Sequence, residues 1–129
     1  MESLRIMANA QPRYKDAHLE VDFIRGLAAL DARQLVLTRK EYELLALLVD
    51  SAGEVVPREA LLMQIWGYSN QIRTRTLDVH VRRLRSKLGE YSQQYIETIF
   101  GVGYRFQPFH ASKVFQPGLS NSRAAMTAA

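Results

Sequence analysis

The chain has 129 residues, a formal net charge of +4 and no cysteine, so there is room for one domain with a single core plus terminal tails. The lack of cysteine excludes disulfide scaffolds and thiolate sites, and its three widely separated histidines match no known zinc-ligand spacing, so no metal or cofactor is expected. No apolar run approaches the roughly 18 residues of a membrane span, and Met1–Gln11 lacks the apolar part of a signal peptide, which makes the cytoplasm the default location.

The first 37 residues predict a tail followed by strands. Residues 1–15 show no hydrophobic period, so we expect a flexible tail or interdomain linker there. Leu19, Val21 and Phe23 alternate with polar neighbours, and Leu35–Leu37 form a brief apolar run. Residues 18–37 are therefore predicted to form short strands.

Two helices are predicted between residues 38 and 66. Thr38 and Glu41 have the spacing of a capping box, which indicates a helix running to about Ser51. A short extended bridge at 54–56 leads to a second helix over 58–66, which the preceding proline helps to start and the following glycine ends.

A third helix is predicted to end at Leu88, and it carries the positive charge of the chain. Residues 73–87 contain six basic side chains and one acidic one, whereas the other 11 basic and 12 acidic residues leave a charge of −1. A positive excess confined to one segment is typical of an element that binds a polyanion.

The helical period sorts this segment into two edges. One edge is apolar and should face the core: Leu77, Val81, Leu84 and Leu88. The opposite edge carries Arg75, Val79, Arg82, Arg83 and Ser86, and it is flanked by Thr76, Asp78 and Arg85. A basic helix face is more often only a solvated surface, but acidic residues are almost missing here. Such a helix fits the major groove of DNA, where arginine can bond guanine and Val79 can pack on a thymine methyl. Asp78 either accepts from cytosine or orients a neighbouring arginine.

The chain ends with a hairpin and a tail. Residues 95–98 and 104–106 are predicted strands joined by a turn at 101–103. Residues 110–129 are poor in bulky side chains, so we expect disorder there. The predicted domain therefore spans residues 16–109.

Four blocks, in this order, resemble the DNA-binding output domain of OmpR/PhoB-type response regulators. They are TRKEYELL at 38–45, REALLMQIWG at 58–67, RTLDVHVRRLRSKL at 75–88 and GVGYRF at 101–106. The resemblance covers about residues 19–106. It implies an α+β winged helix-turn-helix fold with an N-terminal antiparallel sheet, a three-helix core and a C-terminal β-hairpin wing. It also implies sequence-specific binding of double-stranded DNA for transcription regulation, with the third helix in the major groove and the wing near the minor groove.

The resemblance also implies roles for single residues. The expected DNA-binding set is Trp66, Arg73, Arg75, Thr76, Asp78, Val79, His80, Arg82, Arg83, Arg85, Lys87, Phe100 and Tyr104. Within it, Trp66, His80 and Tyr104 are expected near phosphates, although Trp66 and His80 could equally be core residues. The loop expected to face RNA polymerase comprises Gly67, Tyr68, Ser69, Asn70, Gln71 and Ile72.

Two positions depart from the family pattern. Phe100 stands where the family usually has an arginine that enters the minor groove, so it could pack under the wing, touch a neighbouring protomer or wedge at a base step. Pro57 replaces a serine that usually caps the second helix.

Most relatives also carry a receiver domain, so the resemblance implies either an excised output domain of a two-component regulator or a receiver-less relative. Members of the family pair head-to-tail on direct repeats, which makes a homodimer on DNA an expected partner arrangement. The rival interpretation is a winged-helix module that docks an acidic protein. A hydrolase has no support, because no Ser-His-Asp arrangement, phosphate loop or carboxylate pair stands out, and no enzyme activity is expected.

Overall fold

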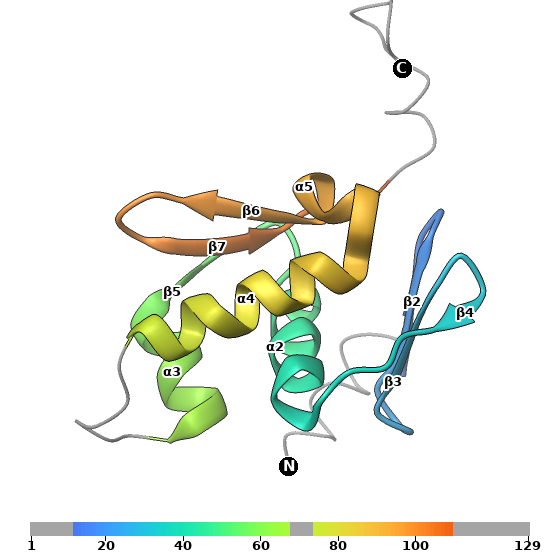
Figure 1. Cartoon of the computed structure of the whole chain (residues 1–129), viewed down its shortest axis with the longest axis horizontal. Coiled ribbons are helices and arrows are strands. Elements are labelled where there is room, and N and C mark those ends of the chain that lie inside the picture. Colours follow the sequence, from blue (N-terminus) through green and yellow to red (C-terminus); the bar gives the residue numbers. More distant parts are fainter. Residues whose placement is uncertain (1–11, 68–73, 110–129) are drawn as a thin grey trace, which may run out of the picture.

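The computed structural model describes residues 12–67 and 74–109. A four-stranded antiparallel sheet in the order β1-β2-β3-β4 lies at one end of the molecule, and a three-stranded sheet in the order β5-β7-β6 lies beside the helices at the other (Figure 1). The first sheet consists of β1 (Arg13–Lys15), β2 (Leu19–Asp22), β3 (Leu27–Leu30) and β4 (Arg33–Gln34). The second consists of β5 (Val55–Pro57), β6 (Ile96–Ile99) and β7 (Gly103–Phe106).

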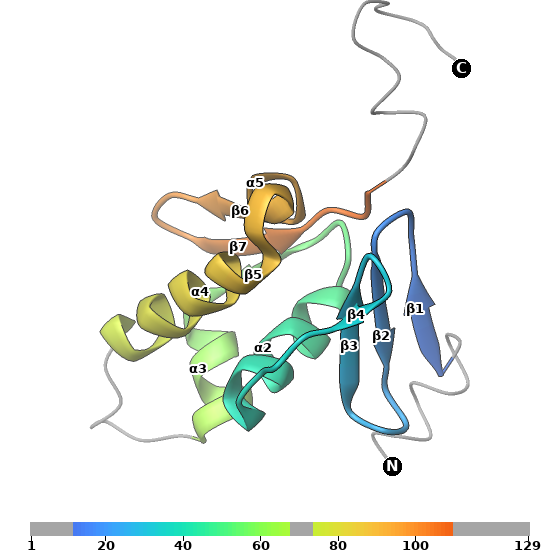
Figure 2. The same cartoon turned by 45° about the vertical axis from the view of Figure 1, so that its right-hand side comes forward.

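The helices lie on the same side of the N-terminal sheet as the wing (Figure 1). They are α2 (Arg39–Asp50), α3 (Arg58–Trp66), α4 (Thr74–Leu88) and the short α5 (Ser92–Tyr95), which follows a single 3₁₀ turn at Gly89–Tyr91. Figure 2 shows α2 next to the N-terminal sheet, with α3 and α4 on its other side. This is the winged helix-turn-helix arrangement that the resemblance implied, with β6 and β7 as the wing. The α5 turn was not anticipated from the sequence.

The N-terminal sheet begins earlier than expected. Strand β1 pairs with β2, and the amide of Phe23 donates to the carbonyl of Pro12 at 3.0 Å. The ring of Tyr14 in β1 meets the ring of Phe106 edge-on, with centroids 5.6 Å apart. Arg13–Lys15 is therefore part of the domain and not of a flexible tail, because it packs on a strand some 90 residues away, which no local pattern indicates.

The start of α2 matches its sequence signal. The Thr38 hydroxyl accepts from the Glu41 amide at 3.2 Å, and the Glu41 carboxylate accepts from the Thr38 amide at 2.9 Å. These two bonds satisfy two of the amides that every helix start leaves without a partner. The predicted capping box is confirmed, and α2 ends at Asp50, one residue from the expected boundary.

The apolar edge of α4 is the centre of the core. Leu77, Val81, Leu84 and Leu88 are all at most 1% exposed, as the helical period predicts. They pack with the leucines of α2 and with Phe106 of the wing in one hydrophobic cluster. The opposite edge of α4 is therefore forced outward.

Strand β5, the third strand of the wing sheet, attaches the hairpin of β6 and β7 to the rest of the domain. Strand β5 pairs with β7, so that Pro57 lies opposite Gly103. A Cβ atom at position 103 would lie 2.0 Å from the carbonyl oxygen of Val56, a distance that only glycine permits. The hairpin was predicted, but this pairing with the bridge between α2 and α3 was not.

The described residues contain no helix with the length and apolar character of a membrane span. The same residues hold no cluster of three or more potential metal-ligating side chains.

Candidate nucleic-acid interface

The edge of α4 that faces away from the core carries three arginines without acidic partners among the described residues. Arg75, Arg82 and Arg83 are exposed, as is Ser86. Within residues 12–67 and 74–109, no carboxylate forms an ion pair with any of the three guanidinium groups. Thr76 and Val79 are half-buried beside this edge. The predicted geometry of α4, with one edge buried and one edge cationic, is confirmed. We call this cationic edge (Arg75, Val79, Arg82, Arg83 and Ser86) the outward edge.

Asp78 lies on the wing side of α4 and holds two groups from other elements. Its Oδ1 lies 2.8 Å from Nη2 of Arg58 on α3 and accepts from the Tyr104 hydroxyl of β7 at 2.8 Å. The Arg58 guanidinium also lies 5.9 Å from the centre of the Tyr104 ring. Of the two roles predicted for Asp78, this geometry favours orientation of an arginine. That arginine comes from α3, which the sequence did not indicate.

Tyr104 is expected near a phosphate, but the structure places it in the core. It is 5% exposed, and its hydroxyl proton is donated to Asp78. Burial and the hydrogen bond to this carboxylate raise the pKa of Tyr104. The side chain thus joins the wing to α4, and a phosphate contact by Tyr104 stays a prediction.

Arg85 also faces the wing instead of solvent. Its Nη2 donates to the Ile96 carbonyl at 2.8 Å and to the Thr98 hydroxyl at 2.7 Å, both on β6. Its guanidinium lies 5.7 Å from the centre of the Tyr104 ring. The side chain lies on the flank of α4, where β6 is close enough to bind it, and a DNA contact by Arg85 stays a prediction.

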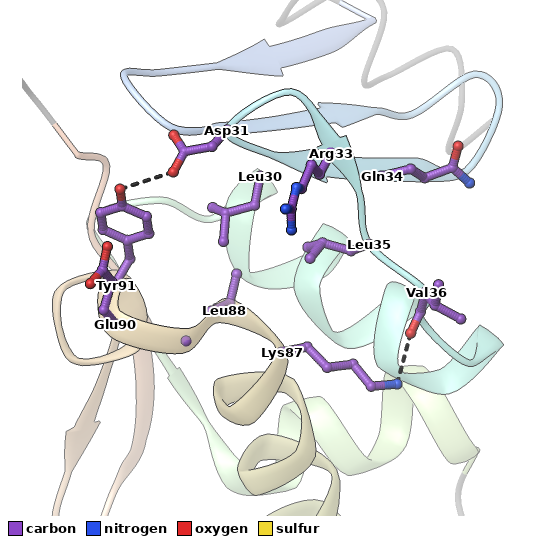
Figure 3. A pocket seen from close by; sticks show the side chains of 11 residues that line it. Leu30, Asp31, Arg33, Gln34, Leu35, Val36, Lys87, Leu88, Glu90 and Tyr91 are labelled. Atoms are coloured by element: carbon purple, nitrogen blue, oxygen red, sulfur yellow. Dashed lines mark hydrogen bonds between the residues drawn. The ribbon is translucent and has the colours of Figure 1, made fainter.

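Lys87 lies on the opposite flank of α4 from Arg85 and forms hydrogen bonds within the protein. Its Nζ donates to Glu41 Oε1 at 2.7 Å and to the Val36 carbonyl at 2.8 Å, the second of which Figure 3 shows. Beside it lies a hollow of about 510 Å³ between β4 and the end of α4, lined by Leu30, Leu35 and Leu88 among others (Figure 3). This ammonium compensates a carboxylate that is 1% exposed, while Lys87 itself is exposed, so a DNA contact by Lys87 stays a prediction.

Glu41 is an ionised group inside the protein. Burial favours its neutral form, but the hydrogen bonds from Lys87 and from the Thr38 amide outweigh burial and lower its pKa below the ordinary value of 4.5. One carboxylate thus completes the capping box of α2 and holds the last turn of α4.

Trp66 and His80 pack on each other where α3 meets α4. Their rings meet edge-on with centroids 4.9 Å apart, and His80 Nδ1 lies 2.8 Å from the Thr76 carbonyl. The ammonium of Lys40 lies 5.8 Å from the Trp66 ring. Both rings are half-buried, so the packing alternative describes their position, and a phosphate contact by either one stays a prediction.

Phe100 lies at the tip of the wing and is 89% exposed. It does not pack under the wing, which removes one of its three predicted roles. Arg73 and the expected polymerase-facing residues Tyr68, Ser69, Asn70, Gln71 and Ile72 lie outside the described residues. Gly67 is described and ends α3 with a φ of 87°.

Known proteins with similar sequences are transcription regulators. A family model described as "Transcriptional regulatory protein, C terminal" matches residues 32–106. The transcriptional regulatory protein SrrA of Staphylococcus aureus is 39% identical over 105 residues, which cover 76% of this chain and 44% of SrrA. The chain thus spans less than half the length of the curated relatives it matches.

Solved structures show the same fold. The response regulator DrrB, a Thermotoga maritima OmpR/PhoB homolog, aligns with a TM-score of 0.72 and 30% identity over 81% of this chain and 49% of DrrB. The DNA-binding domain of Klebsiella pneumoniae RstA, in complex with the RstA box, gives 0.68 and 27% over 75% of this chain and 98% of that domain. The DNA-binding domain of CpxR from E. coli gives 0.67 and 30% over 76% and 98%. The chain therefore belongs to the family of C-terminal domains of transcriptional regulatory proteins, the OmpR/PhoB-type DNA-binding domains.

Proposed function

We propose that this chain binds double-stranded DNA in a sequence-specific manner and thereby regulates transcription, with α4 in the major groove. The observation that carries this proposal is the outward edge, where Arg75, Arg82 and Arg83 have no carboxylate partner among the described residues. Cationic side chains on one face of a helix displace counterions from phosphates. Arginine can also form two hydrogen bonds to guanine, which distinguish it from other bases.

The relatives support the same function. The RstA domain was solved in complex with the RstA box, and the DNA-binding domain of AdeR was solved in complex with an intercistronic region. We further propose that the chain is the output domain of a two-component response regulator or a receiver-less relative, active in the cytoplasm. Head-to-tail pairing on direct repeats and contact between residues 67–72 and RNA polymerase belong to the same proposal. No catalytic activity is proposed.

The experiment that tests DNA binding is selection of duplexes from a random library, followed by titration of the selected duplex at several salt concentrations. The logarithm of the association constant should fall linearly with the logarithm of salt concentration, with a slope that reflects the number of phosphates contacted. Arg33→Ala is the matched control, since Arg33 is also an exposed arginine but lies on β4, in the other sheet from the wing. Arg83→Ala should relax the selected base preference, and Arg33→Ala should leave it unchanged.

The second candidate function, docking on an acidic protein, rests on the same cationic edge. It predicts no enrichment of any base sequence and equal affinity for polyglutamate and duplex DNA of equal charge. Either result would contradict the DNA-binding proposal.

A further inference from the structure

The tip of the wing is apolar and exposed. Residues 99–103 carry no charged side chain, Phe100 is 89% exposed and Val102 is 46% exposed. The Val102 amide donates to the Ile99 carbonyl at 2.9 Å, so Phe100 and Gly101 are the two central residues of a tight turn. Gly101 has a φ of 81°, which glycine adopts without strain. The turn therefore holds an unpacked benzyl group at the extreme end of the hairpin.

Two contacts fix the position of the tip, so that the hairpin does not bend and cover Phe100. The Arg58 amide donates to the Val102 carbonyl at 3.0 Å, which attaches the tip to the first residue of α3. One residue further, Gly103 lies against the Val56 carbonyl too closely for any side chain to fit between them. Phe100 is thus exposed because these contacts fix the position of the wing.

The same Arg58 connects the tip to α4. Its amide bonds Val102, and its guanidinium lies 2.8 Å from Asp78, which stands one helical turn before Arg82 of the outward edge. In both views the loop between β6 and β7 and the N-terminal half of α4 lie at the same end of the molecule, away from the N-terminal sheet (Figures 1 and 2). The tip that carries Phe100 therefore lies at the same end of the molecule as Arg75, near the start of the outward edge.

This charge environment decides which partner fits the tip. Arg82 and Arg83 have no acidic partner among the described residues, so a neutral protein surface docked beside them would leave these guanidinium groups uncompensated. A duplex supplies phosphates for the arginines and apolar base faces for the benzyl group. Phenylalanine is among the side chains that enter the minor groove and partly unstack a base step.

We propose that Phe100 acts as an apolar wedge: when α4 occupies the major groove, its ring enters the minor groove at one base step, unstacks it and bends the duplex. This inference rests on the proposed DNA-binding function. Pyrimidine–purine steps unstack and kink most easily, so one such step should be preferred at a fixed distance from the bases that α4 contacts. Part of the specificity is then for deformability, at a position where the protein makes no hydrogen bond to a base.

The test uses the whole chain and the duplex selected with it, carrying 2-aminopurine at the wing position and a dye pair at its ends. The wild-type chain should raise the 2-aminopurine fluorescence and shorten the end-to-end distance, as expected for a bend of about 20–90°. Phe100→Ala should lose both signals while its affinity falls by no more than about tenfold. Phe100→Leu should keep part of both, because leucine also acts as a wedge, and Val102→Ala should keep both in full.

Each other outcome is informative. Unchanged bending and fluorescence in Phe100→Ala would overturn the wedge. Loss of cooperative binding to two adjacent sites, with bending unchanged, would overturn it too and assign the tip to contact with a second copy. Absence of any duplex binding by the wild-type chain would instead refute the proposed function. Because Phe100 has almost no packing contacts to lose, the thermal unfolding of Phe100→Ala should match that of the wild type.

Discussion

The outward edge of α4 and its two flanks carry similar cationic side chains, yet the structure uses them in opposite ways. Arg82 and Arg83 on the outward edge have no acidic partner among the described residues, whereas Arg85 and Lys87 bond neighbouring elements. The difference comes from rotation by about 100° per residue, which brings residues 85 and 87 to opposite sides of the buried seam. On these two sides, Arg85 is close enough to bond β6, and Lys87 is close enough to bond α2.

This comparison shows that counting charges along a helix overestimates the charge available to a ligand. Two of the six basic residues between 73 and 87 form hydrogen bonds to neighbouring elements and thereby hold α4 in place. Arg85 attaches the wing, and Lys87 attaches the start of α2. The predictions below separate the two groups by asking whether a variant loses DNA affinity or stability.

The largest effect on affinity is expected from removing the outward arginines together. Arg82→Ala combined with Arg83→Ala should weaken binding to the selected duplex by about 100-fold or more, since each arginine that bonds a base contributes roughly 1–3 kcal/mol. The free energy of unfolding should not change, because neither side chain has a partner to lose among the described residues. Fluorescence anisotropy and urea denaturation measure the two quantities, with Arg33→Ala as control. If the double variant kept full affinity for DNA, the outward edge would not be the part of α4 that binds DNA, and its contrast with the flanks would be wrong.

Lys87→Ala should show the reverse pattern. It leaves the carboxylate of Glu41 buried without its cation, which should lower the free energy of unfolding by roughly 2–3 kcal/mol. The affinity of the folded protein for DNA should change little. A variant of normal stability that binds DNA weakly would show that Lys87 contacts phosphate after all.

This loss of stability should also depend on pH. The pKa of Glu41 lies below 4.5 in the native protein, so its contribution is present above pH 4.5 and is lost as the pH falls through the native pKa. In Lys87→Ala, burial dominates and raises that pKa, so acid relieves the buried charge. The stability difference between wild type and variant should therefore shrink in acid. Urea denaturation of both proteins at neutral pH and near pH 3 tests it, and a constant difference would contradict the assigned ion pair.

Arg85→Ala is expected to have a smaller and mixed effect. Loss of its bonds to Ile96 and Thr98 should destabilise the chain by about 1–2 kcal/mol and loosen the wing. Binding should weaken uniformly over all sequences, in contrast to the relaxed preference of Arg83→Ala. Selection from a random library with both variants makes the comparison. A changed base preference in Arg85→Ala would show that its side chain leaves β6 when DNA binds.

The smallest effect is expected for Asp78→Asn. The amide oxygen can still accept from Tyr104, so the position of the wing should be largely retained. Because Asp78 orients Arg58 in the structure, base preference should not change, and affinity should change by only a few-fold. A new preference at one base pair would instead support a direct contact with cytosine.

Periodicity and caps were enough to predict most of the helices and strands, whereas their arrangement as a winged helix-turn-helix was implied by the resemblance to the family. The capping box located the start of α2, and the leucine spacing identified the buried edge of α4 correctly. The β5–β7 pairing was missed because the two strands lie far apart in the sequence. Strand β1 pairs with the next strand, β2, and was missed because its three residues are too few to show a hydrophobic period. Short strands without a local turn carry no signal of such pairing.

The candidate site was only partly predictable for the same reason. Helical angles separated Arg82 and Arg83 from the core, but they do not show what stands beside a flank. The partner of Lys87 is 46 residues away, and the partner of Asp78 belongs to another helix. Arg58 was missed because nothing in the sequence of α3 alone distinguishes it from any other arginine at the start of a helix. The exposure of Phe100 depends on how β5 holds the hairpin, which is again a tertiary property.

The double role of Glu41 has a consequence for how the domain opens. A single oxygen of this carboxylate accepts both the Thr38 amide and the Lys87 ammonium. Undocking the last turn of α4 would therefore leave an uncompensated anion at the first turn of α2, a state of high free energy. The two helix ends should unfold as one cooperative unit, so amide protons in the first turn of α2 and the last turn of α4 should exchange with solvent at the same protection level.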